Sequence, residues 1–280
     1  MFKRIASTVI LWAVIIGSLY AFGAHAAVVM ATLLGVLTLH EFYTLVAKMG
    51  ARPFHYMGLA IAALMLAGPY YIAWFTNEPE VAANLAAGLL VAGLLLSCIR
   101  VLRERDPSNR VETIGATIGG LIYIPYLLHF LVRILMREAD STENLTLCVW
   151  VVAVSKCCDV GALLTGLAFG KHKMCPSISP KKTWEGAVGG VLVSAGIGAT
   201  LAFFQSEHLP ISLTPLVAAL IALPLAIITI VSDLIESAVK RRADIKDAGQ
   251  LIPGIGGAFD LTDSLLLTAP VAYFIFLFLE

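Results

Sequence analysis

Nine runs of apolar residues follow one another along the chain, each about as long as a membrane-spanning helix. A helix needs about 20 apolar residues to cross the hydrocarbon core of a bilayer. The runs lie near residues 5–23, 25–47, 56–75, 81–100, 112–135, 145–169, 184–204, 213–239 and 262–279. Hydrophobic residues make up 59% of the sequence and charged residues 14%, which excludes an ordinary soluble domain. The sequence therefore predicts an all-α, polytopic membrane protein with about nine transmembrane helices.

The basic residues fall on alternate connections between these runs. Lysine and arginine gather at residues 3–4, 48–52, 100–110, 171–182 and 240–246, whereas the intervening connections are mainly acidic. Cytoplasmic connections of membrane proteins carry an excess of lysine and arginine. We therefore expect a cytoplasmic N-terminus. The compact format, with no soluble extension, is typical of a bacterial inner-membrane protein. The short connections predict a single integral-membrane unit, with N-terminal helices in residues 1–110 and a C-terminal region, residues 111–280, that carries a cytoplasm-facing site.

The segment 232–264 concentrates ionisable side chains between two apolar runs. Asp233, Glu236, Ser237 and Lys240 are spaced at i, i+3, i+4 and i+7, which places them on one stripe of a helix. Lys240 and the arginines after it suit an ordinary charged helix end. Asp233 lies about two turns deeper, where a carboxylate is costly unless it faces water, pairs or binds a ligand. Asp233 is therefore predicted to line a polar cavity.

A glycine-rich turn precedes two aspartates in the same segment. Gly256 and Gly257 permit a tight turn, and Asp260 and Asp263 follow at i and i+3. One aspartate at a helix N-terminus would be explained by the helix dipole alone. Two carboxylates on one face also suit Mg²⁺, which prefers a few carboxylates together with phosphate oxygens. The spacing predicts a metal site that handles a phosphorylated substrate.

Three further positions carry charge next to or inside apolar runs. The sequence SPKKTWEG at Ser179–Gly186 places two lysines and two hydroxyl groups before a run, where phosphate could bind, although a positive-inside bias also supplies lysines there. Lys156 and Asp159 lie inside a run at i and i+3, which fits either an ion pair or a site. Glu41, in the sequence HEFY near the end of a run, fits a solvated carboxylate and gives a weaker signal.

Together, the segments 159–186 and 232–264 resemble the membrane phosphatidate cytidylyltransferases, also called CDP-diacylglycerol synthases. The C-terminal pattern of that family matches Ser237, Lys240, Arg241, Lys246, Asp247, Pro253, Gly254, Gly256, Gly257, Asp260 and Asp263. The family's Ser-Pro-Lys-Lys-Thr-x-Glu-Gly sequence is present at Ser179–Gly186, and its Asp-x-Gly-Ala sequence at residues 159–162. Ile255 and Leu261 stand where the family usually has histidine and arginine.

The resemblance implies condensation of CTP with phosphatidate to give CDP-diacylglycerol and pyrophosphate. It implies catalytic roles for Asp233, Lys240, Asp260 and Asp263. The residues implied to bind substrate are Ser179, Lys181, Lys182, Thr183, Ser237, Arg241, Lys246, Asp247, Gly256 and Gly257. The implied ligands of Mg²⁺ are Asp159, Asp233, Asp260 and Asp263, and a second, monovalent cation is left open. The expected partners are CTP, phosphatidate and the bilayer, with no nucleic acid; a homodimer is left open.

Three other functions remain open at this point. A CTP-dependent polyprenol or phytol kinase would use similar cations but would release CDP. A transporter would explain the Lys156–Asp159 pair. An inactive relative that binds lipid is kept open by Ile255 and Leu261.

Overall fold

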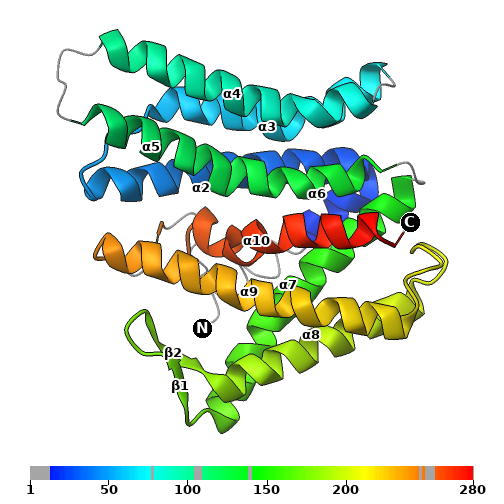
Figure 1. Ribbon diagram of the computed structural model, residues 1–280. Helices are drawn as coiled ribbons and strands as arrows, with labels where there is room; N and C mark the ends of the chain where they lie inside the picture. Colours follow the sequence, from blue (N-terminus) through cyan, green and yellow to red (C-terminus); the bar gives the residue numbers. More distant parts are fainter. Residues whose placement is uncertain are drawn as a thin grey trace. The chain divides into compact units, whose positions relative to one another are not determined.

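The computed structural model describes residues 13–76, 79–103, 109–137, 141–245, 248–249 and 256–279 (Figure 1). Within these ranges, eight helices are long and apolar enough to cross a membrane, and a shorter apolar helix, Ala13–Phe22, precedes them. The start of the first predicted run lies outside the described residues. The prediction of an all-α, polytopic membrane protein is confirmed.

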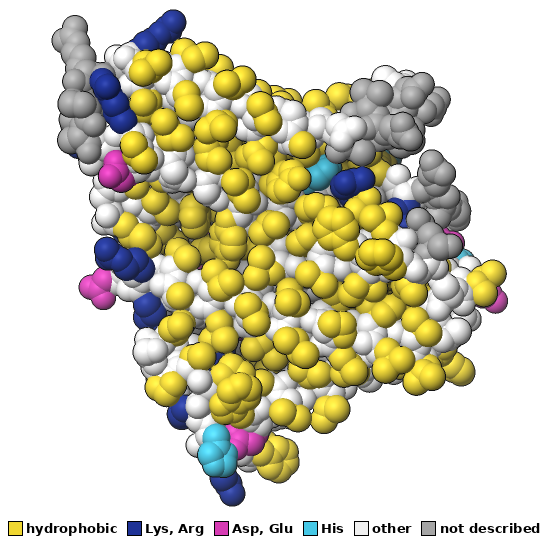
Figure 2. Space-filling model, viewed as in Figure 1, with side chains coloured by type: hydrophobic (Ala, Val, Ile, Leu, Met, Phe, Trp, Pro, Cys, Tyr) yellow, Lys and Arg dark blue, Asp and Glu magenta, His cyan; other side chains and the backbone are white. Residues whose placement is uncertain are grey.

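The helices leave large apolar side chains on their outer faces. Leu95, Leu102, Leu167 and Leu192 are each more than half exposed. Figure 2 shows apolar side chains over most of the visible surface, with the charged side chains toward its margins. A bilayer offers no hydrogen bonds to the backbone, so a chain with such a surface must satisfy its own amides and carbonyls, as helices do.

The chain forms two compact units, and the first joins Met1–Met136 with Arg242–Thr262. Its elements are α2 (Ala24–Lys48), α3 (His55–Thr76), α4 (Pro79–Arg103), α5 (Arg110–Leu121), the π-helical turn η1 (Ile122–Tyr126), α6 (Leu127–Leu135) and the first turn of α10 (Ala258–Leu277). Tyr43 of α2 is fully buried, and its hydroxyl donates to the backbone oxygen of Thr117, 2.7 Å away in α5.

The π-helical turn interrupts the span that contains α5 and α6. Pro125 lies in this turn and lacks the N–H group that an α-helix would use, and π-turns accommodate such interruptions. Tyr123 of the turn has its ring centroid 5.9 Å from that of Phe42 in α2 and 6.3 Å from that of Phe259 in α10. These three rings connect α2, η1 and the start of α10.

The second unit joins Arg137–Arg241 with Asp263–Glu280. Its elements are α7 (Ser141–Phe169), β1 (Lys173–Cys175), β2 (Ser179–Thr183), α8 (Trp184–Phe204), α9 (Pro215–Arg242) and the remainder of α10. α10 is thus one helix with residues in both units. The sequence boundary expected at residue 110 is a different division of the chain and stays a prediction.

The connection between α7 and α8 is an antiparallel β-hairpin. Lys173 pairs with Thr183, and Cys175 pairs with Ser179. The hairpin leads directly into α8, where the Thr183 hydroxyl accepts a hydrogen bond from the Gly186 amide at 3.2 Å. This is the usual way in which threonine satisfies an amide in the first turn of a helix. The hairpin and α8 therefore have a fixed junction.

Glycines allow α7 and α8 to pack closely. A Cβ atom at Gly190 would lie 2.7 Å from the backbone oxygen of Cys158, and one at Gly186 would lie 2.8 Å from that of Ala162. No side chain fits at these positions without separating the helices. Small residues at such contacts are typical of helix packing in membranes, where backbones approach each other directly.

Candidate active site

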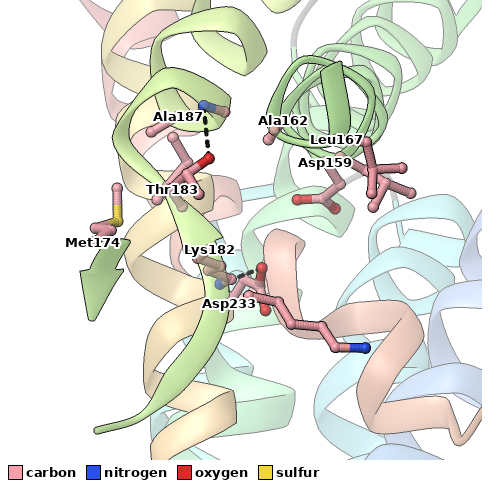
Figure 3. A pocket seen from close by; sticks show the side chains of 13 residues that line it. Asp159, Ala162, Leu167, Met174, Lys182, Thr183, Ala187 and Asp233 are labelled. Atoms are coloured by element: carbon pink, nitrogen blue, oxygen red, sulfur yellow. Dashed lines mark hydrogen bonds and ion pairs between the residues drawn. The ribbon is translucent and has the colours of Figure 1, made fainter. Parts of the chain in front are cut away.

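Asp233 of α9 lines a cavity of about 350 Å³ in the second unit. It is nine residues before the end of α9 at Arg242, and its carboxylate forms an ion pair with Lys182 Nζ of β2. Figure 3 shows these two side chains directed toward each other, while the Asp159 carboxylate of α7 points toward the same space. The prediction that Asp233 lines a cavity is therefore confirmed.

The cavity combines a polar end with apolar walls. Its polar lining consists of Asp159, Lys181, Lys182, Thr183 and Asp233. Its apolar lining includes Leu163 and Leu167 of α7, Met174 of β1, and Ile230 of α9. Leu163 and Leu167 are also largely exposed on the outer face of α7. The cavity can therefore hold a ligand with a charged head and an apolar portion.

Three carboxylates gather beside this cavity. Asp233 and Glu236 of α9 and Asp263 of α10 each offer an oxygen, and these oxygens lie within 4.8 Å of one another. Asp233 and Glu236 share a helix face because they are three residues apart. Their approach to Asp263 is a contact between helices. Carboxylate oxygens in such a group are the ligands that hard divalent cations prefer.

Each of these carboxylates has its own lysine. Asp233 pairs with Lys182, as described above. Glu236, which is 1% exposed, lies 2.7 Å from Lys240 Nζ. Asp263 Oδ1 lies 3.5 Å from Lys156 Nζ, and the same ammonium group lies 3.6 Å from Asp159. Because unpaired charges are costly at such depth, the lysines neutralise this group in the absence of ligands.

Polar contacts between α9 and α10 fix the positions of the carboxylates. The Ser232 hydroxyl donates to the backbone oxygen of Asp263, and the hydroxyls of Thr229 and Thr268 lie 3.0 Å apart one turn away. All of these hydroxyls are buried. Ser232 directly precedes Asp233, so the same contact sets the approach of both aspartates.

The glycine turn and Asp260 belong to the first unit, where Asp260 caps α10. Asp260 Oδ2 accepts a hydrogen bond from the Gly257 amide at 2.8 Å. Gly256 has a φ of 132°, and a Cβ atom there would lie 2.8 Å from the same oxygen. Among the described residues, the group of three carboxylates that could hold a metal ion includes Asp263 but not Asp260. A metal role for Asp260 and for Asp159 stays a prediction.

Some of the remaining predicted site residues lie in the described part of the chain, and two lie outside it. Arg241 Nε donates to the backbone oxygen of Ile178 at 3.3 Å, which connects α9 to the hairpin turn. Ser179 begins β2, and Ser237 is half-buried on α9. Lys246 and Asp247 lie outside the described residues, so their predicted roles stay predictions.

Sequence reasoning left Glu236 and Lys156 out of the predicted site. Glu236 carried a usable signal, because its i+3 spacing from Asp233 already placed both carboxylates on one face. The signal for Lys156 was weaker, because its contact with Asp263 joins residues that are 107 positions apart. A lysine inside an apolar run was nevertheless a sign that a carboxylate partner lies nearby.

Eight apolar helices among the described residues, and paired carboxylates and lysines beside a cavity in the second unit, define a polytopic membrane protein with an ionisable site within its helices. Buried charges of this kind mark ligand or ion sites in membrane proteins. The chain belongs to the cytidylyltransferase family, whose model matches residues 2–279.

Several curated bacterial proteins are similar to this chain. The phosphatidate cytidylyltransferase of Thermotoga maritima is 31% identical over 247 residues, which cover 88% of this chain and 85% of that protein. The one of Bacillus subtilis is 37% identical over 186 residues, 66% of each chain. The one of Mycobacterium bovis is 34% identical over 170 residues, 61% of this chain and 53% of that protein. The match thus spans about half the length of the mycobacterial relatives.

Proposed function

We propose that this protein transfers the CMP group of CTP to phosphatidate, forming CDP-diacylglycerol and releasing pyrophosphate. Its family membership and the names of its relatives support this reaction. The observation that carries the proposal is the double role of Asp233, which belongs to the carboxylate group and also pairs with Lys182 in the cavity. A site for metal ions and a site for phosphates thereby share a side chain.

The reaction needs charge neutralisation more than proton transfer. An oxygen of the phosphatidate phosphate attacks the α-phosphorus of CTP, and the bond from that phosphorus to the pyrophosphate oxygen breaks. The second pKa of a phosphate monoester is about 6, so the attacking oxygen is already largely ionised at neutral pH. No general base is required, and isoleucine at position 255 is compatible with turnover. Two polyanions must still be brought together, which is a task for fixed positive charges.

The carboxylate group fits a magnesium ion. Asp233, Glu236 and Asp263 offer three oxygens within 4.8 Å, and Mg²⁺ commonly takes a few carboxylates and completes its shell with water and phosphate oxygens. When bound there, Mg²⁺ would neutralise charge on the phosphates. Asp159, which lines the same cavity, would border this centre. A second, monovalent cation belongs to the same proposal.

The lysines would bind the phosphates. Lys182 and Lys240 each pair with a carboxylate of the group, and a cation held by those carboxylates would leave both ammonium groups to phosphate oxygens. Lys181 lines the same cavity and is exposed to solvent, so it would attract the triphosphate. Arg241 would hold the hairpin while it contributes positive charge. Lysines bind phosphate as point charges, so small rearrangements are sufficient.

The apolar cavity wall suits the lipid substrate. Leu163, Leu167 and Ile230 would contact the glycerol and the start of the acyl chains, while the phosphate lies at the polar end. We place this end on the cytoplasmic side of a bacterial inner membrane, because the hairpin and the end of α9 carry lysine and arginine, which are in excess on cytoplasmic connections. CTP is a cytosolic nucleotide, so this orientation gives it access.

The direct test uses purified protein, CTP labelled in the α-phosphate and in the cytidine ring, and phosphatidate in mixed micelles. Both labels should enter the lipid in a Mg²⁺-dependent reaction, with pyrophosphate released in equal amount. Asp263→Asn should lower this rate about 10²- to 10³-fold, as loss of one preorganised electrostatic group does in other enzymes. The matched control is Asp244→Asn, an exposed residue with a φ of 55° that asparagine tolerates.

Other outcomes would reject the proposal in distinct ways. Release of CDP, with phosphate from the γ position on the lipid, would identify a CTP-dependent lipid kinase. Binding of CTP and phosphatidate without any transfer would identify an inactive relative. A normal rate for Asp263→Asn would reject the assigned carboxylate group even if the reaction itself were correct.

A further inference from the structure

The N-terminus of α10 is capped by a carboxylate from α2. Glu41 Oε1 accepts a hydrogen bond from the Ala258 amide at 3.0 Å, and Glu41 Oε2 accepts one from the Phe259 amide at 2.9 Å. Ala258 and Phe259 are the first two residues of α10. The first amides of a helix have no partner within the helix, and a nearby side chain often supplies one. Here that side chain comes from a residue 217 positions earlier.

Gly257, the residue before the helix, explains why the cap comes from elsewhere. Glycine has no side-chain oxygen of its own to accept these hydrogen bonds. A Cβ atom at Gly257 would also lie 2.8 Å from the Glu41 carboxyl carbon and 2.7 Å from the Gly249 amide nitrogen. The absence of a side chain is therefore what admits the Glu41 carboxylate to this position.

Two further contacts hold α2 and α10 together around the cap. The rings of Phe42 and Phe259 are 6.0 Å apart in an edge-to-face arrangement, and Phe259 is fully buried. About one turn before Glu41 in α2 and one turn after Ala258 in α10, the hydroxyls of Thr38 and Thr262 lie 2.9 Å apart. Glu41 is thus part of a continuous contact and not a mobile surface carboxylate.

The cap also decides what the start of α10 can bind. Free amides at a helix N-terminus are a common phosphate site. In α10 the Gly257 amide donates to Asp260, and the next two amides donate to Glu41. These three amides are occupied by carboxylates, so this helix end would repel a phosphate. It serves instead to hold α10 in place.

We infer that Glu41 is a positioning residue, which caps α10 and thereby fixes the helix that carries Asp260 and Asp263. Its carboxylate oxygens accept hydrogen bonds from the Ala258 and Phe259 amides, so its role is to hold the helix. The kinetic part of this inference rests on the proposed cytidylyl transfer, whereas the capping part does not.

The experiment compares Glu41→Ala, Glu41→Gln and the wild type in detergent micelles. Hydrogen–deuterium exchange of the peptide 257–264, without substrates, should be about five- to thirtyfold faster in Glu41→Ala, because loss of a cap destabilises the helix start. Glu41→Gln keeps one acceptor oxygen, so its exchange should be intermediate. Exchange in the first turns of α8 should be unchanged, which separates a local effect from general destabilisation. Glu112→Ala, an exposed carboxylate at the start of α5, is the matched control.

Kinetics supply the second readout. Glu41→Gln should lower kcat about tenfold and change KM for CTP less than about threefold, because the proposed phosphate-binding lysines lie on the hairpin and α9. Unchanged exchange in Glu41→Ala overturns the cap. Faster exchange with an unchanged kcat overturns the positioning role. Faster exchange in a protein whose wild type transfers no CMP rejects the proposed function and leaves the cap established.

Discussion

Lys240 Nζ lies 2.7 Å from Glu236 Oε1, one turn away on the same helix, and the Glu236 carboxylate is almost completely removed from solvent. Removing one partner of a buried ion pair costs about 3–5 kcal/mol, because the remaining charge loses its compensation. Lys240→Met should therefore lower the thermal midpoint of the detergent-solubilised protein substantially. Lys173→Met, at an exposed position on β1, should leave it unchanged.

The same variant tests the metal site without any measurement of activity. A divalent cation bound by Asp233, Glu236 and Asp263 would replace the missing ammonium group. Millimolar Mg²⁺ should then raise the thermal midpoint of Lys240→Met more than that of the wild type or of Lys173→Met. An equal rise in all three proteins would contradict a magnesium site at this position.

The two adjacent lysines of the hairpin should differ in importance. Lys182 is half-buried and paired with Asp233, whereas Lys181 is exposed. A fixed ammonium group stabilises developing charge more than a mobile, solvated one. Lys182→Gln should lower kcat/KM for CTP about 10²-fold, and Lys181→Gln less than about tenfold. Steady-state kinetics in mixed micelles would measure both, and equal losses would remove the distinction between the lysines.

Thr183 should couple the hairpin to the stability of α8. Its hydroxyl caps the helix, and a Cβ atom at Gly170 would lie 2.8 Å from that oxygen, so the surroundings are tightly packed. Thr183→Ala should lower the free energy of unfolding by about 1 kcal/mol, and Thr183→Ser should retain most of it. Chemical denaturation in detergent would rank the three proteins. A serine variant as unstable as the alanine variant would show that the methyl group, not the cap, matters.

The spans could be predicted from the sequence because a bilayer imposes both length and composition on each helix. The ends could not. α10 begins at Ala258, four residues before the predicted run at residue 262, because Asp260 and Glu41 satisfy its first amides. Hydropathy has no signal for a helix turn that contains aspartate and is capped from another segment. The hairpin at Lys173–Thr183 was likewise expected only as a connection.

The site was predictable where its geometry is local. The helical spacing of Asp233 and Lys240 and the adjacency of Lys181 and Lys182 can be read directly from residue numbers. The contacts of Lys156 with Asp263 and of Glu41 with α10 depend on which helices meet, and one sequence carries no such information. Glu41 accordingly gave only a weak signal, although its carboxylate caps α10.

The packing of α7 against α8 gives the last prediction. Gly190→Ala would place a Cβ atom 2.7 Å from the Cys158 backbone oxygen and 2.9 Å from Ala162 Cβ, so the helices would have to separate. Overpacking of this kind costs about 1–3 kcal/mol. Gly196→Ala on the same helix meets no atom within 4 Å and should gain up to about 1 kcal/mol from helix propensity. Thermal midpoints measured in one detergent should therefore move in opposite directions. Because α7 also carries Lys156 and Asp159, Gly190→Ala should lose CMP transfer even at temperatures below its thermal midpoint. Equal thermal midpoints and equal transfer rates for the two variants would show that the glycine contact is not tight.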